Sequence, residues 1–258
     1  MSSYVLILTE GEKEEVYAIH SLNDIFLKGE NMHIISFKTN IYSLYSQLKK
    51  DDFETDIIEV LKEKNAGKEI LCGEISIAEI DREDISEIYL LFDYDAHHYD
   101  WNVARSISEL TELVQHFDNE TEQGKLYLSY PMVEAINYHY VNRSESMPVC
   151  YFPYHSGSNA EGKHFKRIQN EAVQFMKKLK KDGFTEDEWL EIFRQFLYVI
   201  HHAINDGTYE NVNPINVFHA QLQLIENEQK IVVLSGIPAL IIEYFGRKFY
   251  DNIVSEAA

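Results

Sequence analysis

The stretch Ile88-Tyr89-Leu90-Leu91-Phe92-Asp93-Tyr94-Asp95 decides the fold predicted for this chain. Its unbroken apolar and aromatic run is typical of a strand buried on both faces of a parallel sheet. The run ends at two carboxylates, which point to the same side if the extended geometry continues for one more residue. Open α/β sheets bind their ligands at the carboxyl ends of their strands. Asp93 and Asp95 therefore predict either a cation held between them or a turn in which Asp95 caps the next helix, and the stretch alone leaves both interpretations open.

Working outward, the first 140 residues alternate between strand and helix patterns. We expect strands at 4–9, 32–37, 88–93 and 125–129, and helices at 12–26, 41–48, 56–64 and 102–117. A short strand can lie within 69–80, and Pro131 suits the first turn of a further helix. This alternation predicts a parallel sheet with right-handed crossovers.

The composition changes near Asn142, where the second half of the chain begins. Residues 143–162 resemble a loop, and helices are expected at 163–181, 185–205, 214–228 and 237–249, with a strand at 230–234. A capping box at residues 185–188 marks one helix start. The sequence thus predicts an α/β fold with a sheet domain at 1–142, flanked by helices, and a mostly helical region at 143–258 that can pack with it as one unit.

The charge balance limits the classes of function. With 23 basic and 43 acidic residues, the chain carries a net charge of −20, which repels nucleic acid at long range. A bare nucleic-acid-binding module, whose affinity depends on Lys and Arg, is therefore disfavoured. The charge remains compatible with an enzyme that gathers carboxylates around a metal and keeps a local basic patch, or with a partner that brings the substrate.

The apolar runs and the cysteines bear on location. The longest apolar run, 231–242, is interrupted by Ser235, Gly236 and Pro238 and is too short to span a bilayer. The two cysteines fit no disulfide framework or metal spacing, and the first residues lack the pattern of a signal peptide. We expect a cytoplasmic protein that does not enter a membrane.

Carboxylates follow three of the expected strands at the point where each strand ends. Glu10 follows the first strand, Asp93 and Asp95 the third, and Glu134 the fourth, while Glu14 comes one helical turn after Glu10. Because parallel strands end at the same edge, these side chains can converge. Clusters of oxygen ligands suit Mg²⁺ or Mn²⁺ rather than zinc. The structural alternative is that Glu10, Glu14 and Glu134 complement the dipoles of the helices that follow them.

Basic residues are scarce, and their positions are therefore informative. Lys163, Lys166 and Arg167 follow the 143–162 loop and are candidates for contacts with substrate phosphates. A second basic group at 177–181 lies at a helix end, where basic residues complement the helix dipole. His97 and His98 follow the aspartates without a partner at a functional spacing, and we assign them a structural or surface role.

Two motifs together carry a family resemblance. Leu8-Thr9-Glu10-Gly11-Glu12-Lys13-Glu14, followed by Leu91-Phe92-Asp93-Tyr94-Asp95, resembles the TOPRIM domain pattern. In that family a Glu at a strand end opens the domain and a DxD pair closes the metal site. The EGxxE form resembles phage-defence nucleases, which include the overcoming-lysogenisation-defect nucleases and related abortive-infection proteins. The resemblance covers about residues 4–140, and the second half of the chain matches no motif.

The resemblance implies a TOPRIM-like sheet and a divalent-metal-dependent nuclease that cleaves phosphodiester bonds in DNA or RNA. Glu10, Asp93 and Asp95 would be the catalytic residues and hold the principal Mg²⁺ or Mn²⁺, with Glu10 as a ligand or general base. Glu14 and Glu134 could help to hold a second cation. The family also implies a role in anti-phage defence and an ABC-type ATPase as partner, while the oligomeric state is open.

Two other functions are compatible with these residues. A phosphatase of the haloacid-dehalogenase type also has a DxD at a strand end, but there the motif normally follows the first strand, and here it follows the third. The second alternative is an acidic TOPRIM-like module that docks on an ATPase without using a metal. The net charge favours that module, whereas the complete set of Glu10, Asp93 and Asp95 opposes it.

Overall fold

The computed structural model describes residues 3–28, 31–66, 71–72, 75–94, 103–141, 149–154, 175–204 and 208–255. At its centre is a five-stranded sheet of order β2-β1-β5-β7-β6. Its strands are β1 (Tyr4–Thr9), β2 (Met32–Ser36), β5 (Ile85–Asp93), β6 (Asp118–Asn119) and β7 (Gly124–Ser129). The pairs β1–β2, β1–β5 and β5–β7 are parallel, and β6 runs antiparallel to β7. The predicted α/β fold with a mostly parallel sheet is confirmed.

Strand β5 lies in the middle of this sheet, between β1 and β7. Each residue from 88 to 92 is at most 4% exposed, which explains why the stretch shows no alternation of apolar and polar residues. In the register, Thr9 lies opposite both Ser36 and Leu91, and Asp93 lies opposite Ser129. The carboxyl ends of β2, β1, β5 and β7 therefore meet along one edge.

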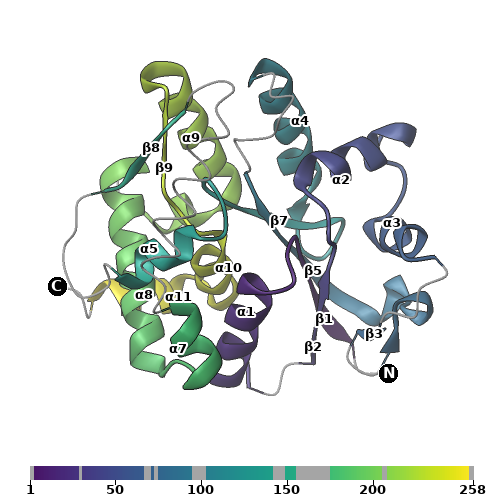
Figure 1. Cartoon of the computed structure of the whole chain (residues 1–258), viewed down its shortest axis with the longest axis horizontal. Coiled ribbons are helices and arrows are strands. Elements are labelled where there is room, and N and C mark those ends of the chain that lie inside the picture. Colours follow the sequence, from purple (N-terminus) through teal and green to yellow (C-terminus); the bar gives the residue numbers. More distant parts are fainter. Residues whose placement is uncertain are drawn as a thin grey trace.

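Helices cover both faces of the sheet (Figure 1). One side carries α1 (Glu14–Ile25), and the other carries α2 (Ile41–Leu48), α3 (Ile57–Lys64) and α4 (Val103–His116). Local signals set two of the starts, because the Asn40 side chain accepts a hydrogen bond from Ser43 N–H and the Asp56 side chain accepts one from Ile58 N–H. The short strands β3 (Leu71–Cys72) and β4 (Ile75–Ser76) form a separate hairpin.

The second half of the chain is mostly helical and packs mainly on the α1 side of the sheet, while its helix α9 lies along β7 and also contacts α4 (Figure 1). Its elements are α5 (Ala135–Val141), β8 (Tyr151–Pro153), α7 (Phe175–Lys181), α8 (Glu186–Val199), the π-helix η4 (Ile200–Ile204), the 3₁₀ helix η5 (Tyr209–Val212), α9 (Pro214–Glu228), β9 (Lys230–Val232), α10 (Gly236–Phe245) and α11 (Arg247–Ser255). Helix α10 contacts β5, β7 and α1, so both halves of the chain contribute to one hydrophobic core. None of the helices in the described ranges has the length and apolar character that crossing a membrane requires.

The closing helix expected at 237–249 is wrong, because the structure has two helices there. Helices α10 and α11 are separated by Gly246, whose φ of 74° and ψ of −169° lie outside the helical region. A residue with a side chain rarely adopts this conformation, so glycine at this position permits the break.

The helix expected to start at Pro131 begins instead at Ala135, and Pro131 follows a cis peptide bond. The chain stays extended past β7 because Tyr130 pairs with Leu234. Tyr130 N–H donates to the Leu234 carbonyl at 2.7 Å, and Leu234 N–H donates to the Tyr130 carbonyl at 2.9 Å. This pairing attaches the strand region around β9 to the edge of the main sheet, while β9 itself pairs with β8.

Candidate metal centre

Glu10 and Asp93 lie together at the carboxyl edge of the sheet. Glu10 N–H donates to the Leu91 carbonyl at 2.9 Å, which continues the β1–β5 ladder by one residue. The Glu10 carboxylate then accepts a hydrogen bond from Asp93 N–H, with 3.1 Å between Oε2 and N. Both residues are half-buried. The structure therefore brings side chains from two separate strands to one point at the strand ends.

Neighbouring hydroxyl groups fix the turn that carries Glu10. The Thr9 and Ser36 hydroxyls donate to the Gly11 carbonyl at 2.7 and 2.8 Å, and Lys38 N–H donates to the Glu10 carbonyl at 3.1 Å. These bonds hold the end of β1 against the end of β2. These bonds therefore fix the backbone of the turn, while the bond from Asp93 N–H orients the Glu10 carboxylate.

A second buried carboxylate next to this turn belongs to Glu15. Helix α1 starts at Glu14, whose side chain lies outside the described residues, and the Glu15 side chain is only 4% exposed. A Cβ atom at Gly11 would lie 2.9 Å from Oε2 of Glu15, so this carboxylate packs over the turn. The burial of Glu15 could have been predicted from the helical spacing of the sequence, because Glu15 shares a helix face with the buried residues Ala18 and Ile19.

Glu134 lies in the segment between β7 and α5. It is 2% exposed and directly precedes the first residue of α5. A carboxylate at this depth requires compensation by hydrogen bonds or positive charge, whereas one that complements a helix dipole can stay in water. Its burial makes it a structural or ligand-binding residue of the interior.

The helix α5, which begins directly after Glu134, carries a buried histidine. His139 of α5 is fully buried, and its Nε2 accepts a hydrogen bond from Ser235 N–H at 3.2 Å. Burial lowers the pKa of His139 to about 3, so its imidazole is neutral at physiological pH. It connects α5 to the start of α10 as an uncharged acceptor.

Several predicted site residues lie outside the described residues, namely Asp95, Lys163, Lys166 and Arg167, and so do His97 and His98, to which we assigned a structural or surface role. Within the described ranges, no group of three or more His, Cys, Asp or Glu side chains is close enough together to hold a metal ion. Glu10 and Asp93 offer two oxygen ligands, which is the donor type that Mg²⁺ and Mn²⁺ prefer. In the predicted set, Asp95 is the next ligand along the chain.

Sequence reasoning missed two lysines near the Glu10 turn. Lys38 follows β2 and forms an ion pair with Glu12 at 2.5 Å. Lys64, the last residue of α3, donates to the Phe37 carbonyl and places its Nζ 4.2 Å from the centre of the Phe37 ring. The two lysines belong to different parts of the chain, and the tertiary fold brings them to this turn. A search for basic residues that are neighbours in the sequence could not have found them.

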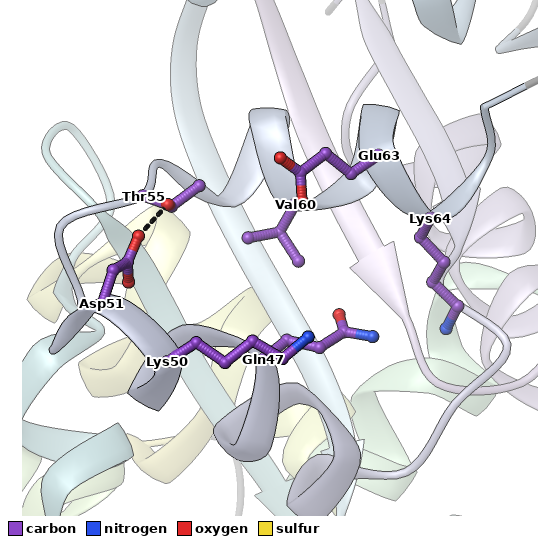
Figure 2. A pocket seen from close by; sticks show the side chains of 7 residues that line it. All are labelled: Gln47, Lys50, Asp51, Thr55, Val60, Glu63 and Lys64. Carbon is purple, nitrogen blue, oxygen red and sulfur yellow. Dashed lines mark hydrogen bonds between the residues drawn. The ribbon is translucent and has the colours of Figure 1, made fainter.

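Lys64 also borders an open pocket of about 350 Å³ between α2–η1 and α3, where η1 spans Lys49–Asp51. Figure 2 shows Gln47 and Lys50 on one side of it and Glu63 and Lys64 on the other. Two lysines and two acidic residues line this pocket, so their formal charges sum to zero. The pocket therefore favours neither anionic nor cationic ligands.

Comparisons of the chain with protein-family models, with curated proteins and with solved structures find no match. The class that the fold and the site define is therefore an α/β protein with a mostly parallel sheet and carboxylates at the carboxyl ends of adjacent strands.

Proposed function

We propose that this chain is a divalent-metal-dependent nuclease of TOPRIM type that cleaves phosphodiester bonds in DNA or RNA. The observation that carries this proposal is the hydrogen bond between the Glu10 carboxylate and Asp93 N–H, which joins the two halves of the motif at one edge. Had the two residues been far apart, no shared cation site would have been possible. The buried carboxylate of Glu15, which packs against Gly11, lies next to the same turn.

Each residue has a defined part in this proposal. Bound Mg²⁺ or Mn²⁺ would stabilise negative charge on the phosphodiester and lower the pKa of a water molecule. Glu10, Asp93 and Asp95 would hold the cation, and the hydrogen bond from Asp93 N–H fixes the orientation of the Glu10 carboxylate. Glu10 acts as a ligand or as a general base. Lys38 N–H donates to the Glu10 carbonyl and Lys64 donates to the Phe37 carbonyl, so both lysines lie next to the Glu10 turn and would contact substrate phosphates.

The proposed setting is anti-phage defence with an ABC-type ATPase as partner. The charge of −20 supports a need for such a partner, because the chain alone repels nucleic acid at long range. A partner that binds the substrate would bring the scissile phosphate to the carboxylate edge.

The test is cleavage of DNA and RNA with Mg²⁺ or Mn²⁺, alone and with candidate ATPases, comparing the wild type with Glu10→Gln and Asp93→Asn. Glu10→Gln keeps an acceptor for Asp93 N–H and removes only the charge. Because loss of groups that merely orient metal ligands costs 10–100-fold, loss of a ligand should lower the cleavage rate by at least about 100-fold. Glu210→Gln is the control, since Glu210 on η5 is exposed and pairs with Arg247 in the second half of the chain.

The charge also favours a second candidate, a docking module that does not use a metal. Isothermal titration calorimetry with Mn²⁺ separates the two candidates. Metal binding that Asp93→Asn abolishes, together with cleavage, supports the nuclease. Absence of metal binding, with retained binding to an ATPase, would reject the nuclease in favour of the docking module.

A further inference from the structure

A second pocket, of about 490 Å³, opens near the amino-terminal ends of β5 and β7. Four tyrosines line it, namely Tyr89 on β5, Tyr127 on β7, Tyr209 on η5 and Tyr244 on α10. The ring centre of Tyr89 lies 6.2 Å from that of Tyr127 and 6.1 Å from that of Tyr244. This volume is within the usual range of pockets that bind small molecules. Tyr209 and Tyr244 are half-buried, whereas Tyr89 and Tyr127 are only 4% and 1% exposed.

The same pocket carries an excess of negative charge. Glu87, Glu120 and Glu243 line it, and Lys125 is the one basic side chain among its lining residues, all of which are described. Three carboxylates against one ammonium group leave a formal charge of −2. An ion-pair network that serves stability alone would be expected to balance its charges, because an uncompensated carboxylate near low-dielectric walls is unfavourable.

The contacts show which carboxylates are already neutralised. Glu243 accepts from Lys125 Nζ at 2.8 Å, from the Tyr127 hydroxyl at 2.7 Å and from Asn213 Nδ2 at 3.1 Å. Glu120 lies farther from Lys125, at 3.8 Å. The Glu87 carboxylate accepts a hydrogen bond from the Tyr89 hydroxyl at 2.8 Å. This donor is neutral and leaves the charge of Glu87 uncompensated. The negative charges of Glu87 and Glu120 are thus the ones that a ligand would meet.

We propose that this pocket binds a small organic dication that carries two ammonium groups, of the linear diamine class. The two surplus carboxylates match its two charges, and the partly exposed rings of Tyr209 and Tyr244 would attract an ammonium group and cover the methylenes beside it. Burial raises the pKa values of Tyr89 and Tyr127 well above their ordinary range, so both hydroxyls stay protonated and keep donating to their carboxylates.

An inorganic cation fits this pocket less well. Lys125 Nζ already occupies the position between Glu120 and Glu243 where a metal ion would have to bridge the two carboxylates. Mg²⁺ requires close oxygen ligands in octahedral geometry, whereas aromatic walls offer it none. The proposal is also independent of the nuclease proposal, because Glu87 precedes Asp93 by six residues on β5 and lies toward the opposite end of the strand.

A ligand series on the unaltered protein tests the proposal by calorimetry at constant ionic strength. We expect 1,4-diaminobutane to bind saturably at one site per chain. The monocation 4-aminobutan-1-ol should bind at least about fivefold more weakly, since one charge–carboxylate interaction is worth about 1 kcal/mol or more, and butane-1,4-diol should not bind. Equal binding of the diol and the diamine, or no saturable binding of the diamine, would overturn the proposal.

Variants locate the site. Glu87→Gln keeps an acceptor for the Tyr89 hydroxyl and should weaken diamine binding at least about fivefold. Tyr209→Leu removes an aromatic face and should weaken it about two- to tenfold. Glu59→Gln is the matched control, because Glu59 on α3 is exposed and pairs with Lys62, and it should leave binding unchanged. Diamine binding that survives both pocket variants, or that Mg²⁺ displaces at equal concentration, contradicts the assignment.

Discussion

At the scale of single residues, Gly11 shows how the candidate centre depends on a missing side chain. A Cβ atom at Gly11 would lie only 2.9 Å from Oε2 of Glu15. Because glycine has no Cβ, the Glu15 carboxylate can fold back over the turn that carries Glu10. The absence of a side chain at Gly11 thus leaves room for the Glu15 carboxylate in this structure. Two acidic residues approach the same turn because the residue between them has no side chain.

His139 supplies a prediction on pH at the same scale. Its pKa is about 3 in the folded protein, against an ordinary value of 6.5. Between these values the unfolded chain binds a proton that the folded chain does not, so stability falls as the pH decreases below 6.5 and is unaffected above it. When the pH is lowered from 7 to 5, the free energy of unfolding should therefore fall in the wild type by about 2 kcal/mol more than in His139→Gln. Urea denaturation at both pH values measures this difference.

The control for this measurement is His20→Gln, which replaces an exposed imidazole on α1 and should keep the wild-type pH dependence. Because the comparison uses the change with pH, a constant loss of stability in either variant does not affect it. An unchanged pH dependence in His139→Gln would mean that this imidazole gains a proton in the folded state.

At the scale of elements, the start of α8 follows from four residues. The Thr185 hydroxyl accepts from Glu188 N–H at 3.3 Å, and the Glu188 carboxylate accepts from Thr185 N–H at 3.0 Å. The capping box predicted from the sequence is confirmed. Lys178 of α7 also pairs with Glu188 at 2.5 Å, so the cap connects two helices.

Removing this cap should destabilise the protein by a predictable amount. Thr185→Ala is expected to lower the free energy of unfolding by about 1 kcal/mol, the usual value for a lost N-cap, as measured by denaturant unfolding. Ser46→Ala is the control, because the exposed Ser46 hydroxyl bonds to the Tyr42 carbonyl within α2 and caps no helix end. A loss in Thr185→Ala no larger than that in the control would show that the capping box does not stabilise α8.

Elements defined by local signals could be predicted from the sequence, and those defined by distant partners could not. The strand at 4–9 and the helices at 41–48 and 214–228 have the predicted bounds. Periodicity and helix caps depend on residues that are close together in the sequence. The pairing of β9 with β8, and of Leu234 with Tyr130, joins segments far apart in the chain. Periodicity carries no information on such pairing. The Glu10–Asp93 contact was predictable only because parallel strands end at one edge.

At the scale of the whole molecule, the two halves of the chain depend on each other. Helix α10 covers β5 and β7, and its residues Ile237, Leu240 and Ile241 are at most 1% exposed. The Lys125–Glu243 ion pair and the Tyr127–Glu243 hydrogen bond cross the same interface. Without the second half, the sheet therefore loses its cover over β5 and β7, on the face that also carries α1.

The last prediction follows from this shared core. A chain ending at residue 142 exposes the apolar face of β5 and β7, and each buried side chain of Leu or Ile size lost to water costs about 1.5–3 kcal/mol. Since the stability of a whole domain is only about 5–15 kcal/mol, we expect residues 1–142 alone to lack a cooperative unfolding transition by circular dichroism and to aggregate. The full chain, and a mixture in which residues 143–258 are co-expressed with 1–142, serve as controls. A truncated chain that is monomeric and unfolds cooperatively would show that the first half is an independent domain, on which the second half is only docked.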